Sequence, residues 1–268
     1  CTFVFAVLAA GRDDASRKAK LAGVAVAFVA VALGALILAV DARGGLLNPL
    51  RYFNLLGNFG SVMTWGVVLI SLFLVGAFVC GVLLVLKRNV PRALEVVTAV
   101  LGVGVSLYTG VLLSTAPAFP LWNLAVLPVA FVVSAAYTGY AAYALAARFT
   151  LPSGTALPAW TGKVALVLPV LEVVALVALL VVVSATTGSA APYAIQSVAN
   201  LLTGSNAVVF WGGVVAVGLA APFALALVRT RKGEAAPSWF GVAEAVCILT
   251  GGFAFRYAVI MAAVPMFA

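Results

Sequence analysis

The sequence contains no histidine, and its three cysteines are isolated from one another. Haem b in a membrane bundle is normally held by histidine, and iron–sulfur clusters need grouped thiolates, for which no CxxC spacing is present. We therefore expect the protein to bind no haem and no metal of its own. Cys1, Cys80 and Cys247 are interpreted as small apolar packing residues.

Charge is scarce as well. Charged residues make up 8% of the 268 residues, whereas hydrophobic residues make up 65%. Soluble domains carry about 25% charged residues, so this protein cannot hide its apolar side chains in a water-soluble core. The apolar runs extend for about twenty residues, whereas spanning strands would alternate in polarity over about ten. The sequence predicts an all-α integral membrane protein.

Eight apolar runs can be distinguished. The first, at residues 2–11, has half the length of a bilayer crossing and is interpreted as the end of a span whose start precedes Cys1. No basic start or cleavage site is visible, so we expect no signal peptide. The other runs lie at about 19–40, 64–86, 93–115, 121–147, 163–186, 206–228 and 240–264. Residues 1–268 are expected to form one transmembrane domain, a bundle of eight helices with the first truncated.

Basic residues are concentrated in alternate linkers. The linkers after the first, third, fifth and seventh runs hold Arg12, Arg17, Lys18, Lys20, Lys87, Arg88, Arg92, Arg148, Lys163, Arg229, Arg231 and Lys232, and the others hold only Arg43 and Arg51. Because Lys and Arg favour the cytoplasmic face, both termini and the linkers at 41–63, 116–120 and 187–205 are expected to be extracytoplasmic. We interpret the net charge of +8 as an orientation signal and expect no nucleic-acid partner. The long linkers at 41–63 and 187–205 suit either the docking of a partner or a lid over the bundle.

A few charged residues fall inside the runs. A charge at the centre of a span costs about 2.5–3.5 kcal/mol, so each one needs a partner, water or a function. Glu95 and Glu244 are expected near the cytoplasmic ends of the fourth and eighth spans, and Glu172 near the midplane. Asp41 and Arg256 are expected toward the outer surface.

Two interpretations of these charges stand. In the functional one, Asp41 and Arg256 help to hold the polar head group of a lipid-soluble ligand, and the three glutamates lead protons inward from the cytoplasm. In the structural one, Asp41 and Arg256 form an ion pair, and Glu95 pairs with Arg92 or Arg88 at the interface.

The most specific stretch covers residues 106–139. Tyr108 lies in an SxYxG setting near the end of one run, where small neighbours let a flat ring approach the backbone. Two prolines then end the helix, and Trp122 and Asn123 open the next one. Tyr108 is either a ligand-site residue or a member of the interfacial aromatic belt.

The segment YTGVLLSTAPAFPLWNLAVLPVAFVVSA resembles the YxGxLL…PLWN…LPxxFxxSA signature of the NrfD/PsrC-like membrane subunits of polysulfide reductase and related complex iron–sulfur molybdoenzymes. Three further matches occur in the right order. VDARGG resembles the family's LDLGRP turn, GSVMTWGVVL resembles its SPMSWGxW opening of the third span, and FWGGVVAVGLAAP with GGFAFRYAVI resemble its last two helices. The resemblance covers essentially the whole sequence.

The resemblance implies a membrane anchor that is not catalytic alone. Such subunits lack haem, bind menaquinone, and exchange electrons with a ferredoxin-like 4Fe–4S subunit that serves a molybdopterin catalytic subunit. It also implies the cytoplasmic membrane of a prokaryote, with the quinone site and the partner on the extracytoplasmic side. Tyr108 matches the quinone-bonding tyrosine, Asp41 and Arg256 match polar positions of the same region, and Trp122 and Asn123 match the turn that shapes the pocket mouth. Proton translocation and the terminal substrate stay open.

The sequence departs from the family pattern at two places. VDARGG lacks the family's proline, and AVLAAG stands where the family has GGLAAG, so the wall that the first helix contributes is not assigned. The alternative function is a secondary transporter, in which Glu172 and Arg256 bind an ion or a small solute near the midplane. Transporters of this kind have paired helix breaks, whereas Pro169 is a single break without a counterpart.

Overall fold

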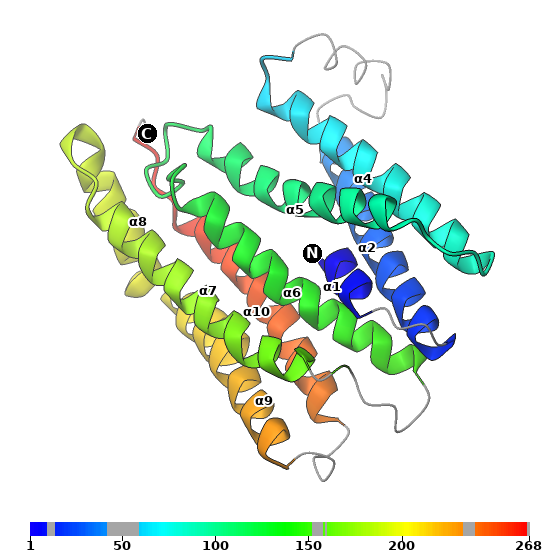
Figure 1. The fold of residues 1–268 in the computed structure, drawn as a ribbon. Helices are drawn as coiled ribbons and strands as arrows, with labels where there is room; N and C mark the ends of the chain where they lie inside the picture. Colours follow the sequence, from blue (N-terminus) through cyan, green and yellow to red (C-terminus); the bar gives the residue numbers. More distant parts are fainter. Residues whose placement is uncertain (10–13, 42–58, 152–157, 159, 233–238, 267–268) are drawn as a thin grey trace.

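The computed structural model describes residues 1–9, 14–41, 59–151, 158, 160–232 and 239–266. All regular structure within these ranges is helical (Figure 1). The elements are α1 (Thr2–Leu8), α2 (Asp14–Asp41), α4 (Val62–Val85), α5 (Arg92–Ser114), α6 (Leu127–Thr150), α7 (Trp160–Ser184), η1 (Gly188–Ala190), α8 (Ala191–Leu202), η2 (Val209–Ala220), α9 (Ala221–Lys232) and α10 (Phe240–Ala262).

Seven helical segments in this part of the protein are long and apolar enough to cross a membrane. They correspond to the second to eighth predicted runs, and η2 continues into α9 as one segment, Val209–Arg231. The first predicted run forms only the seven-residue helix α1. The prediction of a helical membrane bundle is therefore confirmed, whereas an eighth crossing is not found among the described residues.

Three boundaries differ from the predicted ones. α2 begins at Asp14, so Lys20 lies within a helix and not in a linker. α6 begins at Leu127 instead of residue 121, because Asn123 accepts hydrogen bonds from the N–H groups of Ala125 and Leu127 and so forms a turn before the helix. Pro128 occupies the first turn of α6, where its missing N–H costs little. The predicted linker at 187–205 contains η1 and the amphipathic helix α8, which buries Ala194 and Leu201.

α6 lies at the centre of the bundle, in contact with α1, α2, α5, α7 and α10. On one side of it, α1, α2, α4 and α5 pack together as the N-terminal group. On the other side, α7, α8, η2, α9 and α10 form the C-terminal group (Figure 1). A residue on α6 can therefore face either group, depending on its position around the helix.

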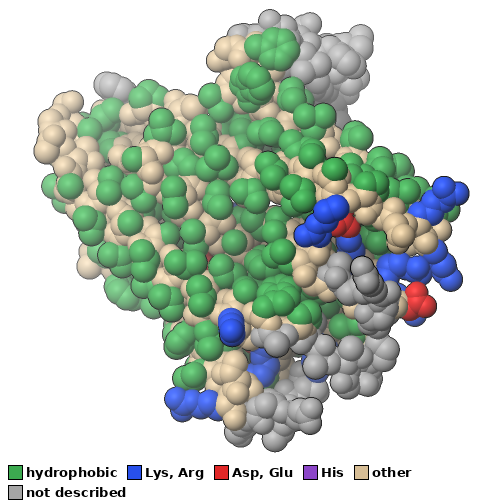
Figure 2. Space-filling model, viewed as in Figure 1, with side chains coloured by type: hydrophobic (Ala, Val, Ile, Leu, Met, Phe, Trp, Pro, Cys, Tyr) green, Lys and Arg blue, Asp and Glu red, His purple; other side chains and the backbone are tan. Residues whose placement is uncertain are grey.

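Lys and Arg side chains gather at one end of the bundle, which we call the basic end. In Figure 2 they lie along the right and lower edges, while hydrophobic side chains cover most of the rest of the visible face. The basic end contains the starts of α2, α5 and α7 and the ends of α4, α6 and α9. This clustering is the distribution that the predicted orientation requires.

η2 and α10 approach each other at two glycines. η2 is a twelve-residue π-helix, a long stretch for a form that mostly occurs as single turns. A Cβ added to Gly218 would lie 2.6 Å from the Cα of Gly251. The two backbones are thus in direct contact, as small residues allow at helix crossings in membranes.

Replacing Gly251 with Val should therefore separate η2 from α10. We expect a loss of about 1–3 kcal/mol in the free energy of unfolding, the usual cost of overpacking a tight contact. Denaturant titration of the purified protein in mild detergent measures it. Gly212→Val is the matched control, since no atom lies within 4 Å of a Cβ added at this position of η2. Equal stability of the two variants would contradict the close crossing.

Candidate functional site

Tyr108 is buried between α5 and α4, with 7% of its surface exposed. Its ring lies directly over Gly66 of α4, so closely that any Cβ at position 66 would overlap the ring carbons next to the hydroxyl. The sequence predicted that the Tyr108 ring approaches the backbone next to its own small neighbours. The glycine that allows this approach is Gly66 of another helix, whereas Gly110 packs against Pro128. Among the described residues, the Tyr108 hydroxyl makes no hydrogen bond. It lies about 24 Å along α5 from Arg92, toward the end opposite the basic end.

Trp122 and Asn123 fix the loop between α5 and α6. The Trp122 indole Nε1 donates a hydrogen bond to the Val259 carbonyl of α10 at 3.1 Å. The Asn123 Oδ1 accepts one from the Ala125 N–H at 2.8 Å and thereby shapes the turn before α6. Both residues therefore brace the loop at the end of the bundle toward which Tyr108 lies.

Arg256 points from α10 toward α6. Its guanidinium donates hydrogen bonds to the Gly252 carbonyl at 2.7 Å and to the Ser134 hydroxyl at 3.4 Å. The same group lies 5.8 Å from the centre of the Phe131 ring. Glu172 of α7, with 5% of its surface exposed, lies near Ser134 and Arg256 but forms no ion pair with Arg256. A buried acid and a half-buried base therefore lie close to the same serine in the C-terminal group.

The structure does not bring together all residues that were predicted to form one site. No contact between Tyr108 and Arg256 is found in the described ranges, and the helices that carry them pack against different sides of α6. Asp41 ends α2, but its side chain, like Arg43, lies outside the described residues. Glu172, which was assigned to a proton path, lies near Arg256 in the C-terminal group.

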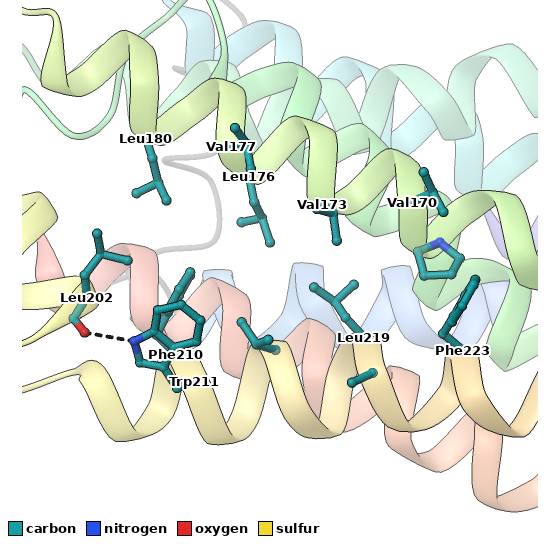
Figure 3. A pocket seen from close by; sticks show the side chains of 13 residues that line it. Val170, Val173, Leu176, Val177, Leu180, Leu202, Phe210, Trp211, Leu219 and Phe223 are labelled. Atoms are coloured by element: carbon teal, nitrogen blue, oxygen red, sulfur yellow. Dashed lines mark hydrogen bonds between the residues drawn. The ribbon is translucent and has the colours of Figure 1, made fainter.

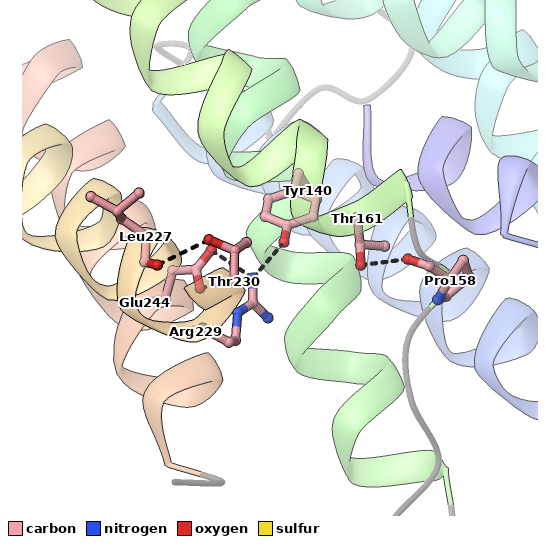
Figure 4. A network of polar contacts seen from close by, with 7 residues as sticks. All are labelled: Tyr140, Pro158, Thr161, Leu227, Arg229, Thr230 and Glu244. Atoms are coloured by element: carbon pink, nitrogen blue, oxygen red, sulfur yellow. Dashed lines mark hydrogen bonds and ion pairs between the residues drawn. The ribbon is translucent and has the colours of Figure 1, made fainter. Parts of the chain in front are cut away.

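A second polar cluster lies nearer the basic end of the same group (Figure 4). Arg229 of α9 donates hydrogen bonds to the Tyr140 hydroxyl at 3.4 Å and to Glu244 Oε1 at 3.3 Å, and lies 3.1 Å from Glu244 Oε2. A cavity of about 20 Å³ adjoins these side chains and reaches Arg148 at the end of α6. A space of this size holds roughly one water molecule.

Glu95 belongs to a separate cluster in the N-terminal group. Of the two arginines considered from the sequence, the structure pairs it with Arg92, whose Nη1 lies 3.2 Å from Glu95 Oε2. Lys20 of α2, which was assigned to a linker, contacts the other carboxylate oxygen. Glu95 is thus held by two cations and does not continue the polar row formed by Glu172 and Glu244. Sequence spacing did not indicate that Lys20 pairs with Glu95 or that Arg229 pairs with Glu244.

An apolar groove lies between α7 and the η2–α9 segment (Figure 3). Its volume is about 470 Å³, and Val173 and Leu176 face Leu219 and Phe223 across it. Near one end the Trp211 Nε1 donates a hydrogen bond to the Leu202 carbonyl at 2.9 Å. The lining suits hydrocarbon chains and offers no charged group for a polar head group.

Comparisons with known proteins agree with this architecture. The family model described as "Polysulphide reductase, NrfD" matches residues 1–268. The sequence is also similar to the C subunit of polysulfide reductase from Wolinella succinogenes, with 33% identity over 267 residues, which cover 90% of this protein and 80% of the relative. The protein therefore belongs to the NrfD family of polysulfide reductase membrane subunits.

Proposed function

We propose that this protein is the menaquinone-binding membrane anchor of a respiratory oxidoreductase complex in the cytoplasmic membrane of a prokaryote. It exchanges electrons between the quinone pool and a ferredoxin-like 4Fe–4S subunit, which serves a molybdopterin catalytic subunit. Family membership and the likeness to a subunit of polysulfide reductase support this assignment. The protein alone is inert, because the electrons leave through cofactors of its partners.

The surroundings of Tyr108 fit a quinone head group, and this observation carries the proposal. Tyr108 is only 7% exposed as a residue, but its hydroxyl oxygen is not fully enclosed and has no hydrogen-bond partner in the described part of the protein, so it is free to donate to a ligand. Gly66 leaves room for the ring and fixes its plane. A phenolic O–H so placed can donate to a quinone oxygen while the ring stays in position.

Bound menaquinone supplies the reversible uptake of two electrons and two protons. The Tyr108 hydroxyl holds one ring oxygen by a hydrogen bond and favours negative charge on it. Trp122 and Asn123 keep the mouth of the site in shape, since both hydrogen-bond within the loop or to α10. Arg256 is occupied by Ser134 and the Gly252 carbonyl and lies near Glu172, which favours a role in proton movement over direct contact with the quinone.

Isolation of the intact complex tests the assignment. An affinity tag on this protein, in its own host, should recover a 4Fe–4S subunit and a molybdopterin subunit in fixed proportion. Iron and molybdenum analysis and extraction of bound quinone identify the cofactors. Recovery of a solitary protein that carries solute across vesicle membranes would instead establish the transporter alternative.

We further propose that Glu172 and Glu244 move protons across the C-terminal group during turnover. Both are buried, and a basic residue faces each of them. Intramembrane acids of this kind commonly line proton relays. Glu95 is left out of this path, because Lys20 and Arg92 hold its carboxylate.

Replacing Glu172 with Gln should uncouple proton movement from electron transfer. The amide keeps the shape of the side chain but cannot bind and release a proton at neutral pH. We expect the complex in proteoliposomes to keep oxidising quinol in the presence of an uncoupler, while protons moved per electron fall to the value set by quinone chemistry alone. Glu172→Asp, which keeps an acid, should restore translocation. An unchanged proton yield in Glu172→Gln would remove this residue from the path.

A further inference from the structure

Tyr137 lies between the two polar clusters of the C-terminal group. It follows Ser134 by three residues on α6 and precedes Tyr140 by three, so each of the three is a neighbour of the next on the helix surface. Ser134 contacts Arg256, which lies near Glu172, whereas Tyr140 contacts Arg229, which is bound to Glu244. Each step along this row is about 4.5 Å along the helix axis.

The Tyr137 hydroxyl is both buried and unpaired. Only 2% of the residue is exposed, and the hydroxyl has no hydrogen-bond partner among the described residues. Glu172 of α7 and Glu244 of α10 both lie near enough to act on it electrostatically. The hydroxyl therefore lies within the influence of both acids while bound to neither.

A phenylalanine at this position would be more favourable for the fold. A buried hydroxyl without a partner costs about 1–3 kcal/mol, and its removal leaves the packing of the ring intact. The packing of α6 therefore gives no reason for tyrosine rather than phenylalanine at position 137. Its position, between a residue that contacts Arg256 near Glu172 and a residue that contacts Arg229 beside Glu244, matches what a proton carrier needs.

We propose that Tyr137 passes protons between Glu244 and Glu172, an inference that rests on the translocation proposed above. The Tyr137 oxygen accepts a proton from the carboxyl group of Glu244, directly or through one water molecule. In the same step its own O–H proton passes to the carboxylate of Glu172. One O–H bond forms and one breaks at the phenol, which stays neutral, and a rotation of the new O–H resets it. The small cavity beside Glu244 and Arg148 is the mouth of this row at the basic end.

The test compares Tyr137→Phe with Tyr143→Phe in the assembled complex. Tyr143 is an equally buried tyrosine of α6, but its ring lies beside Gly23 of α2 and so faces the N-terminal group. In proteoliposomes, Tyr137→Phe should retain uncoupled quinol oxidation and lose the protons moved beyond quinone chemistry. Tyr143→Phe should retain both. Thermal unfolding of Tyr137→Phe should occur at the parental temperature or above it, because no packing is lost.

Infrared difference spectra of the same complexes give a second readout that does not depend on turnover. Carboxyl bands are first assigned with Glu172→Gln and Glu244→Gln. Tyr137→Phe should then shift the bands of both acids, and Tyr143→Phe neither. If the parental complex moves no extra protons, the proposed translocation itself fails. If the parental complex moves extra protons, and the Tyr137→Phe complex moves as many with unshifted carboxyl bands, only the role of Tyr137 is overturned.

Discussion

Tyr108→Phe is expected to lower quinol oxidation by the assembled complex about a hundredfold, the usual effect of removing a positioned proton donor. The substitution deletes one hydroxyl and leaves the ring on Gly66, so the fold has no reason to change. Steady-state rates with a menaquinol analogue, together with the quinol concentration at half-maximal rate, measure the loss. A hydrogen bond that is stronger in the transition state than in the bound quinol predicts a fall in kcat larger than the rise in KM.

Tyr257→Phe is the control for this experiment. Tyr257 lies next to Arg256 in sequence, near the same end of the bundle, but 43% of its surface is exposed. Loss of its hydroxyl should leave the rate unchanged. The iron and molybdenum content of each variant complex shows whether the partners are still bound. A Tyr108→Phe complex of full cofactor content that works at the parental rate would exclude Tyr108 from the quinone site.

Glu95→Gln should lower the free energy of unfolding by about 3 kcal/mol, because breaking a buried ion pair leaves an uncompensated charge. Lys20 is 8% exposed and would face a neutral amide instead of a carboxylate. Denaturant titration of the purified protein in mild detergent measures the difference in the free energy of unfolding. The double variant Lys20→Met with Glu95→Leu removes both charges and should regain most of the stability.

Asp14→Asn provides the comparison. Asp14 also forms an ion pair, 3.5 Å from Arg17, but its side chain is 86% exposed. Exposed pairs contribute little, so this variant should be as stable as the parent. Equal stability of Glu95→Gln and Asp14→Asn would mean that the cluster of Glu95, Lys20 and Arg92 does not hold α2 against α5.

The membrane-spanning helices could be predicted from sequence because each one is a local property. About twenty consecutive apolar residues suffice to identify a span, whatever its neighbours are. α8 was not predicted because it lacks such an apolar run. It alternates apolar residues with polar ones such as Gln196 and Asn200 and is only twelve residues long, so hydropathy alone suggests a loop.

The contacts between helices could not be predicted in the same way. Tyr108 was identified from its own surroundings, yet the residue that seats it, Gly66, comes from another helix. Arg256 was grouped with Tyr108 because both were expected near the outer surface. Depth in the membrane says nothing about which side of α6 a residue occupies, and Arg256 in fact meets Ser134. A single sequence carries no information on which side of α6 a residue of another helix occupies.

The contact between Lys20 and Glu95 has a consequence for biosynthesis. The two residues are 75 positions apart, a stretch that a ribosome adds in roughly 4–15 s at its usual rate. During this interval Lys20 has no carboxylate to meet, and a charge within the hydrocarbon costs several kcal/mol. The nascent helix should therefore wait with its first turns among the lipid head groups. It reaches its final depth only when α5 emerges and brings the acid that neutralises it.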